Sequence, residues 1–316
     1  MSRQDIRTLI LPEFFEKLFN YVRESTQEID QSLNINSNNI RLLGTLKCIA
    51  SIYKYGKREE LLKYTSPTLK LMLEQDLLNK SQLNLVRKFH MKIIQRIGCT
   101  FFKVKLAKWR YQRGSRTLMN NLNRDTILLG SSTSDKTQNG KLEGEDDEEE
   151  NIPFEIEEII EQLFSGLKDK DTIVRWPSAK GIGRITNRLS IDMAEDVLNS
   201  LLEMFTFIED DSAWHGACLS IAELGRRGLL LPKQLDQVVP IVLKALVFDK
   251  RIGNYSLGRN VRDAACYVCW SLARAFEPDD IKPYVNQIAG ALLIVTVFDR
   301  EVNCRRAASA AFQGKR

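Results

Sequence analysis

Two pairs of residues in this chain have a spacing that could support chemistry. Cys266 and Cys269 form a Cys-x-x-Cys pair, which is half of a zinc site or a redox dithiol. His215 lies three residues before Cys218, so that a helix would place the two side chains together as a base and a nucleophile. A zinc site needs two more ligands, and a catalytic pair needs an orienting group and an oxyanion hole. We therefore interpret these cysteines as small core residues and expect neither a catalytic residue nor a metal.

A second motif that could support chemistry is the glycine pair Gly181 and Gly183. A dinucleotide-binding loop requires a preceding strand and a third glycine three positions further on, where this chain has Thr186. We expect these glycines to allow close helix packing, and we expect no cofactor.

The third motif is a basic run with interleaved aromatic residues, KVKLAKWRYQRGSR, over residues 103–116. Residues 77–124, which contain it, hold twelve Lys and Arg and no Asp or Glu. Three interpretations remain open: a solvated helix face, a docking face for an acidic protein, or a surface for nucleic acid or anionic lipid. The candidate partner-binding residues are Lys103, Lys105, Lys108, Trp109, Arg110, Arg113 and Arg116.

Composition restricts the class of protein. Hydrophobic residues make up 43% of the 316 positions and charged residues 28%, which is ordinary for a soluble fold. No uncharged apolar run reaches the roughly 18 residues of a membrane span, since the best one covers only 288–298. The first residues lack the features of a signal peptide, and the six cysteines are scattered. We expect a cytoplasmic protein without a transmembrane segment.

Four similar segments begin at Val174, Ala213, Val261 and Val302, at intervals of 39, 48 and 41 residues. A period near 40 is typical of stacked helix pairs, and the long interval contains an inserted loop at residues 249–260. No alternating strand pattern is present. The register predicts that the buried positions are Ala179, Ile182, Cys218, Ile221, Cys266, Cys269 and Ala307.

The residues around these segments indicate where the helices begin and bend. Asp171, Asp210 and Asp299 each lie three residues before a segment, where an N-cap is expected. Proline residues should kink or restart three of the helices; they are Pro177, Pro240 and Pro283. The predicted fold is all-α, a HEAT/armadillo-type α-solenoid of antiparallel helix pairs interrupted by an acidic disordered linker.

The expected domain organisation follows the charge pattern. Residues 1–129 would form N-terminal helical repeats ending in the basic segment, and 152–316 a HEAT-repeat array truncated at its C-terminal end. Residues 130–151 would be the linker, because a polar stretch ending in GEDDEEE buries too little apolar surface to order itself.

Five strings of the chain are more specific than a generic helical repeat. They are KLAKWRYQRGSR (105–116), GLKDKDTIVRWPSAKGIGRI (166–185), AWHGACLSIAELGRRGLLLP (213–232), NVRDAACYVCWSLARAFEP (260–278) and VFDREVNCRRAASAAFQ (297–313). In these strings the chain resembles the tubulin-folding cofactor D family, also called tubulin-specific chaperone D, most densely over residues 101–313. Pro177 departs from the small helix former expected there, and the chain ends in GKR where the family continues, so we expect a partial or variant chain.

This resemblance implies a non-enzymatic cofactor that binds β-tubulin after the chaperonin and assists assembly of the αβ-heterodimer. It also implies a contribution to GTPase activation of tubulin, and sister tubulin-folding cofactors and an ARF-like small GTPase as partners. Microtubule association follows, and no nucleic acid is expected. The alternatives are another HEAT-repeat scaffold, of the transport-receptor or phosphatase-adaptor type, and a nucleic-acid-binding helical protein.

Overall fold

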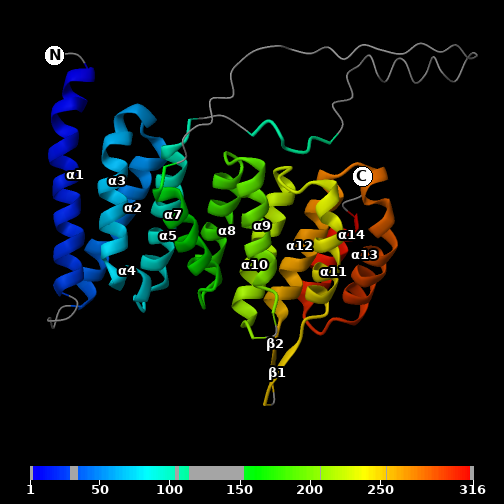
Figure 1. Ribbon diagram of the computed structural model, residues 1–316. Coiled ribbons are helices and arrows are strands. Elements are labelled where there is room, and N and C mark those ends of the chain that lie inside the picture. The colour runs from blue at the N-terminus through cyan, green and yellow to red at the C-terminus, as the bar shows by residue number, and fades with distance from the viewer. Residues whose placement is uncertain are drawn as a thin grey trace, which may run out of the picture.

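The segments with a period near 40 form one layer of helices in a two-layered array. The computed structural model describes residues 3–28, 35–103, 107–113, 153–206, 208–253 and 255–313, so the predicted acidic linker lies outside the described residues. The helices follow one another from α1 to α14 across Figure 1. This arrangement confirms the all-α solenoid of paired helices.

The first helices of the pairs form the layer nearer the viewer in Figure 1. They are α1 (Arg3–Glu28), α3 (Arg58–Glu74), α7 (Glu155–Leu167), α9 (Ile191–Glu203), α11 (Leu235–Leu246) and α13 (Pro278–Phe298). Two short elements, α4 (Asp76–Lys80) and the 3-10 turn η1 (Pro232–Gln234), complete the connections.

The second helices form the other layer, in which each helix packs against the next. They are α2 (Ile35–Tyr55), α5 (Asn84–Phe101), α8 (Thr172–Thr186), α10 (Asp211–Arg226), α12 (Arg259–Ala275) and α14 (Val302–Gln313). The last four of these helices contain the similar segments that begin at Val174, Ala213, Val261 and Val302.

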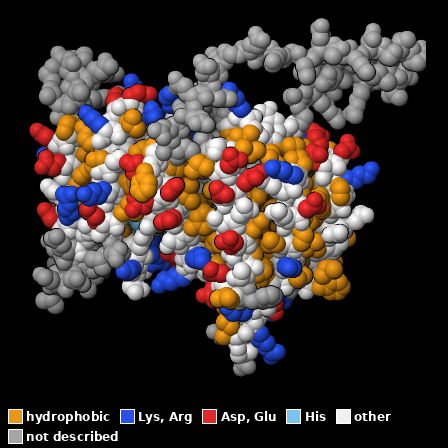
Figure 2. All heavy atoms as spheres, in the orientation of Figure 1, with side chains coloured by type: hydrophobic (Ala, Val, Ile, Leu, Met, Phe, Trp, Pro, Cys, Tyr) orange, Lys and Arg blue, Asp and Glu red, His pale blue; other side chains and the backbone are white. Residues whose placement is uncertain are grey.

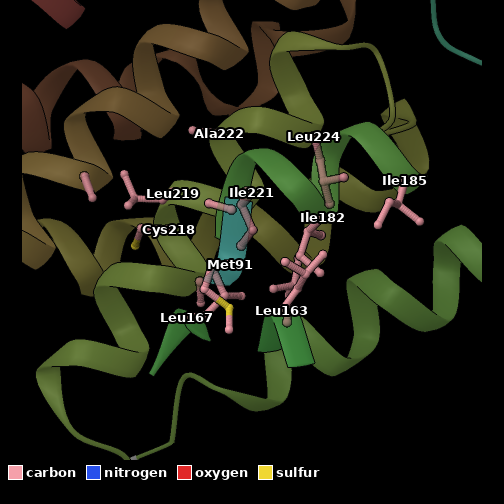
Figure 3. Packing of buried hydrophobic residues seen from close by; sticks show 14 of the residues in the cluster. Met91, Leu163, Leu167, Ile182, Ile185, Cys218, Leu219, Ile221, Ala222 and Leu224 are labelled. Atoms are coloured by element: carbon pink, nitrogen blue, oxygen red, sulfur yellow. The ribbon is translucent and has the colours of Figure 1, made fainter. Parts of the chain in front are cut away.

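The core runs continuously between the layers. Figure 3 shows Met91 of α5 and Leu167 of α7 directed toward the same interior as Ile182 of α8 and Cys218 of α10. Gly216 is required here, because a Cβ atom at this position would lie 2.2 Å from the Leu167 carbonyl oxygen. Small residues in α10 therefore let it approach α7 closely, and burial of the apolar surface stabilises each pair against its neighbours.

Six of the seven positions predicted to be buried are buried, and Ala307 is only half-buried. The alignment of the fourth segment was wrong by two residues. Arg305 donates to the Asp299 carbonyl oxygen at 2.6 Å, as Arg175 does to that of Asp169. Cys304 therefore stands where Val174 stands in α8, and the buried residues of α14 are Cys304, Ala308 and Ala311.

Asp171 and Asp210 stand at the predicted N-cap positions of α8 and α10, but their carboxylates make no capping hydrogen bond. The prediction for Asp299 was wrong, because this residue is the C-cap of α13 and α14 begins only at Val302. Asp171 pairs with Arg87 and Asp210 with Lys250. Asp299 receives Arg262 Nε at 2.6 Å and the backbone amide of Glu301 at 2.8 Å. Arg87 and Arg262, each from the preceding repeat, thus take the carboxylates of Asp171 and Asp299, and Lys250 from a later loop takes that of Asp210. A charge-assisted bond is stronger than a neutral one.

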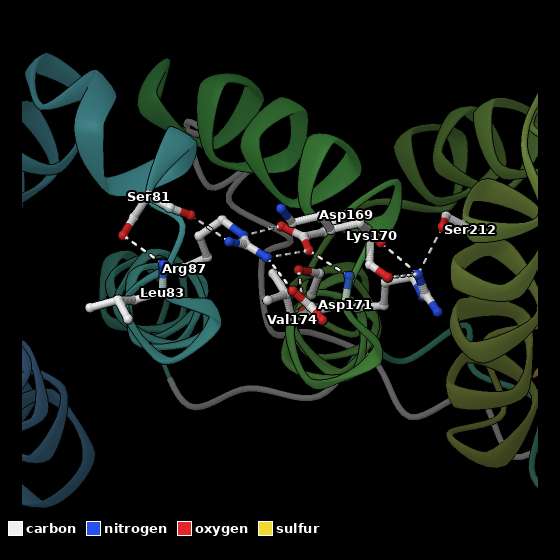
Figure 4. A network of polar contacts seen from close by, with 10 residues as sticks. Ser81, Leu83, Arg87, Asp169, Lys170, Asp171, Val174 and Ser212 are labelled. Carbon is white, nitrogen blue, oxygen red and sulfur yellow. Dashed lines mark hydrogen bonds and ion pairs between the residues drawn. The ribbon is translucent and has the colours of Figure 1, made fainter.

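The strongest of these connections joins α5 to the turn before α8. Arg87 Nε lies 2.7 Å from Asp169 Oδ2, and its Nη2 donates to the other carboxylate oxygen at 3.2 Å. Figure 4 shows the continuation from Asp169 toward Ser212, which accepts a 2.9 Å hydrogen bond from Arg175. Three successive repeats are therefore joined through two buried arginines.

The three prolines that were expected to kink or restart a helix do not restart it. α8, α11 and α13 each continue through Pro177, Pro240 and Pro283 respectively. A proline removes one backbone hydrogen bond, and α8 packs against α5, α7 and α10 on its remaining sides. Tertiary packing supplies most of a helix's stability in a protein, and it outweighs this loss.

The inserted loop contains a small β-hairpin, contrary to the expectation of no strands. β1 (Lys250–Ile252) pairs antiparallel with β2 (Tyr255–Leu257), and this is the one sheet within the described residues. Gly253 at the turn has a φ of 58°, a conformation that glycine adopts readily. The hairpin accounts for the long interval between α11 and α12.

Helix α13 is long and apolar enough to cross a membrane by length and composition alone. It packs against α14, α11 and α12 in the array, and it exposes Leu293, Ile294, Val297 and Phe298. A single helix that passes this test is weak evidence, so α13 is not a clear transmembrane span.

Candidate functional site

Within the described residues, the central part of the basic run is not helical. Its residues 107–113, which we call the strap, contain no helix and lie along one edge of the array, at the top of Figure 1. Lys103 lies just after α5, and Lys105 and Arg116 lie outside the described residues.

The strap binds the C-terminal ends of three second helices. The amide of Ala107 donates to the carbonyl oxygen of Asn187 at 3.0 Å, just beyond α8. Trp109 Nε1 donates to the carbonyl oxygen of Leu189, in the same loop, at 3.0 Å. The amide of Tyr111 donates to the Gly228 carbonyl oxygen at 2.8 Å, beyond α10. Since helix C-termini carry unpaired carbonyls and a negative partial charge, a basic segment suits this edge.

Tyr111 continues the connection to α12 and α13. Its ring lies 4.9 Å from that of Phe276, centroid to centroid. Its hydroxyl donates to Asp280 Oδ2 at 2.5 Å and accepts the Glu277 amide at 3.0 Å. Arg113 Nη1 donates to the Arg274 carbonyl oxygen at 3.1 Å. Trp109 and Arg113 are therefore occupied by contacts within the chain.

We expect Gly228→Ala to loosen the strap. Gly228 has a φ of 72°, and an added Cβ atom would lie 2.1 Å from the Tyr111 carbonyl oxygen. The free energy of unfolding should fall by about 1 to 3 kcal/mol, and hydrogen exchange at the Tyr111 amide should accelerate at least about tenfold. Gly290→Ala is the control, because nothing lies within 4 Å of its added Cβ atom. Unchanged exchange at Tyr111 in Gly228→Ala would contradict this account of the strap.

Several helices in the middle of the array differ in charge between the two layers. In the second layer, α2, α5 and α8 hold three, four and three Lys and Arg residues and no Asp or Glu. In the first layer, α7 and α9 each hold four acidic residues and no Lys or Arg. Figure 2 shows acidic side chains over the middle of the first-layer face, where Figure 1 places α7 and α9. The middle of the first layer is therefore acidic, whereas α2, α5 and α8 make the adjoining part of the second layer basic.

The basic surface is built from stripes with a four-residue spacing. Lys88, Lys92 and Arg96 follow this spacing on α5, and Lys180 and Arg184 follow it on α8. When the two helices are aligned by repeat, Lys92 corresponds to Lys180 and Arg96 to Arg184. We define the basic face by the second-layer residues Lys54, Lys88, Lys92, Arg96, Lys180, Arg184, Arg226, Arg227 and Arg274.

Electrostatic coupling shows that these cations are neighbours. The pKa of Lys92 lies below its ordinary value, first because of burial and then because of Lys88, Arg96, Lys180 and Lys54. Burial and then Arg184 lower the pKa of Arg96. These cations repel one another, and a bound anion would reduce that repulsion. Binding of an anion to this surface is therefore favourable.

Backbone and amide acceptors orient the arginines of this face. Arg184 Nη1 donates to Gln95 Oε1 at 3.2 Å, and Arg96 donates to the carbonyl oxygen of Ala50. A guanidinium has five N–H groups, so one such bond fixes its position and leaves donors for a ligand. Burial alone would raise the pKa of Glu223, but Arg226 and Arg227 hold it below its ordinary value.

An aromatic row lies beside these cations. Trp176 of α8 and Tyr267 of α12 have ring centroids 5.8 Å apart, and Tyr267 stacks on Trp270 at the same distance. Lys180 Nζ lies 5.4 Å from the Trp176 ring centroid, and the Arg274 guanidinium lies 5.3 Å from that of Trp270. The face thus combines positive charge with apolar contact area.

The residues considered for catalysis occupy the core. His215 Nδ1 accepts a 2.8 Å hydrogen bond from Arg175 Nε, and burial together with Arg175 lowers its pKa to about 3. Burial raises the pKa of Cys218 and Cys266, and that of Cys269 to about 12. Such thiols stay protonated and are poor nucleophiles and metal ligands. Across the described ranges, no three His, Cys, Asp or Glu residues gather in a way that could hold a metal ion.

Sequence reasoning missed the basic face because its residues come from five helices. One available signal was the repeat alignment, which places Lys92 with Lys180 and Arg96 with Arg184. The search for a continuous basic run found the strap instead.

A two-layered array of helix pairs with a charged face and a buried, unreactive core defines an armadillo-type repeat scaffold. The family model described as "Tubulin-specific chaperone D-like, ARM repeats" matches residues 85–315. This chain belongs to that family, whose members are chaperones built on such repeats.

Two curated relatives of this chain have names that agree with this family. Tubulin-specific chaperone D of Dictyostelium discoideum is 41% identical over 280 residues, which are 86% of this chain and 19% of the relative. Tubulin-folding cofactor D of Schizosaccharomyces pombe is 32% identical over 180 residues, 52% of this chain and 16% of the relative. The chain thus spans about a fifth of the length of these relatives or less.

Solved structures resemble the chain only loosely. Kap121p bound to RanGTP matches 98% of this chain and 30% of that one, with a TM-score of 0.46 and 10% identity. A designed armadillo repeat protein in complex with the peptide (KR)4 covers 93% of this chain and 98% of that chain, with a TM-score of 0.41 and 13% identity.

Proposed function

We propose that this chain is a working part of a tubulin-folding cofactor, acting as a non-enzymatic scaffold that binds β-tubulin. The observation that carries this proposal is family membership over most of the chain, including 41% identity to a tubulin-specific chaperone D. The physical features agree, since stacked helix pairs offer a long surface for a large folded client.

The further roles belong to the same proposal and rest on the family resemblance. They are participation in αβ-heterodimer assembly, contribution to GTPase activation of tubulin within the cofactor complex, and binding of sister cofactors and an ARF-like small GTPase. A cytoplasmic location with association to microtubules accompanies these roles. In this account the scaffold binds and positions its client, and the GTP hydrolysed belongs to tubulin.

The experiment is capture of purified β-tubulin released from a chaperonin by this 316-residue chain, with size-exclusion chromatography as the readout. We expect co-elution of the chain with β-tubulin. A designed armadillo repeat protein of similar length is the control for non-specific binding to a helical array. Equal capture by both proteins, or none by this chain, would overturn the proposal for this part of the cofactor.

A further inference from the structure

The second-layer surface differs from the surface of an ordinary soluble helix, which mixes both charges. Its cations extend without interruption from Lys54 on α2, through Lys92 and Lys180, to Arg226 on α10 and Arg274 on α12. Glu223, which lies beside Arg226 and Arg227, is buried and already paired with both of them. Asp211 and Asp263 lie in the N-terminal turns of α10 and α12, whereas Arg226 and Arg274 lie in the C-terminal turns of these helices. This surface therefore faces solvent as a positive field with little internal compensation.

We propose that the basic face is a docking surface for an extended, acidic segment of a partner protein that also carries aromatic or aliphatic side chains. The inference rests on the arrangement of charge and aromatic rings in this chain, and it does not depend on the identity of the client. Its occupant is defined by chemistry: carboxylates at intervals, with apolar side chains between them.

Carboxylates suit the arginine positions. Arg184 and Arg96 are each oriented by one bond to a neutral acceptor, so their remaining donors can form the paired N–H contacts that a carboxylate accepts. Each new anion would also relieve repulsion between neighbouring cations. Arg227 adds a further sign of incomplete pairing, because its buried Nε atom has no hydrogen-bond partner.

The aromatic row explains why the segment should not be purely acidic. Trp176 is 37% exposed, and its ring adjoins that of Tyr267, which in turn stacks on Trp270. Aromatic rings bury large apolar areas on binding, which a polyglutamate chain would leave unused. An apolar side chain in the segment would pack on this row while its neighbouring carboxylates reach Lys180 and Arg274.

The dimensions set the length of the segment. Packed helices lie about 8 to 10 Å apart, so the three steps from α5 to α12 cover about 27 Å. An extended chain advances about 3.3 Å per residue, so about eight to ten residues would cross the face.

The observations favour a polypeptide over a nucleic acid. The chain carries a net charge of only +5, because the acids of α7, α9 and residues 131–151 offset most of its cations. A long polyanion reaching beyond the basic face would meet these acids, whereas a short acidic segment would not.

The test uses a fluorescent peptide of about ten residues with alternating Glu and Leu and one Trp, and a matched peptide with Gln in place of Glu. Binding to the full chain is followed by anisotropy at low ionic strength. Lys92→Glu combined with Arg184→Glu should weaken binding of the acidic peptide at least about tenfold. Lys63→Glu combined with Lys70→Glu on α3 changes net charge equally outside the basic face, and it should change binding less than about twofold.

Two further measurements keep the test decisive. Lys180→Gln, a single change at an exposed position, should weaken binding in the same direction if the double variant unfolds. A single-stranded oligonucleotide of equal charge should compete poorly with the peptide. Equal loss in both double variants, equal binding of the Gln peptide, or tighter binding of the oligonucleotide would each overturn the proposal.

Discussion

Replacing Arg87 with methionine should lower the free energy of unfolding by about 3 to 5 kcal/mol. The side chains of Arg87 and Asp169 are only 5% and 13% exposed. Without the arginine, a buried carboxylate would lose its counter-charge, and the connection between α5 and the α8 repeat would be lost. Urea unfolding of purified chains measures this change directly.

Two companion variants separate the charge effect from the loss of packing. Arg87→Met combined with Asp169→Leu leaves no unpaired charge, and it should recover most of the lost stability. Lys70→Met is the control for an exposed ion pair. Lys70 Nζ lies 3.8 Å from Glu74 Oε1, and both side chains are at least half exposed. Its effect should stay below about 0.5 kcal/mol. A small effect of Arg87→Met would show that the bidentate pair does not stabilise the array.

Mild acid should destabilise the fold well before its carboxylates titrate. Burial lowers the pKa of His90 to about 4, and burial with Arg175 lowers that of His215 to about 3. Both should titrate near 6.5 in the unfolded chain. Between pH 6.5 and about 4 the unfolded chain therefore binds more protons, and stability falls as the pH falls. The slope should approach about 1.4 kcal/mol per pH unit for each histidine, and it should vanish above pH 7.

Single replacements identify the source of this slope. His215→Gln and His90→Gln should each remove about half of the change in unfolding free energy between pH 6.5 and pH 5. The slope is compared within each variant, so any overall loss of stability from the replacement does not affect the comparison. Equal stability of the parent chain at pH 6.5 and pH 5 would mean that these imidazoles are not held neutral.

The sequence was sufficient for the repeat architecture because burial follows a period. Ala179, Cys218 and Cys266 recur at one place in their helices, and packing between layers forces small or apolar residues there. The same reasoning placed α14 wrongly by two residues, since VNCRRAASA contains several small residues that fit either register. Arg305 would have corrected this alignment. In α8 the buried Val174 is followed directly by Arg175, and in α14 the buried Cys304 is followed in the same way by Arg305.

The polar connections could not be predicted from local pattern. An aspartate before a helix fits an N-cap equally well whether or not an arginine from another repeat reaches it, and Arg87 and Asp169 are 82 residues apart. The contacts of the strap were even harder to predict, because Tyr111 donates a hydrogen bond to Asp280, which lies 169 residues further along the chain. Its conformation is set by carbonyl groups at helix ends, which have no signature of their own in the sequence.

The strap also changes how a repeat array should unfold. In an ordinary solenoid each unit contacts only its immediate neighbours, so units at the ends can fray independently of those in the middle. Residues 107–113 instead contact the α8, α10 and α12 units together and reach the start of α13. Loss of one of these units thus weakens the others beyond nearest-neighbour range. The α8, α10 and α12 units should therefore unfold together as a single cooperative block. Their folding should be slower than that of an ordinary solenoid, because the strap contacts join residues far apart in the sequence.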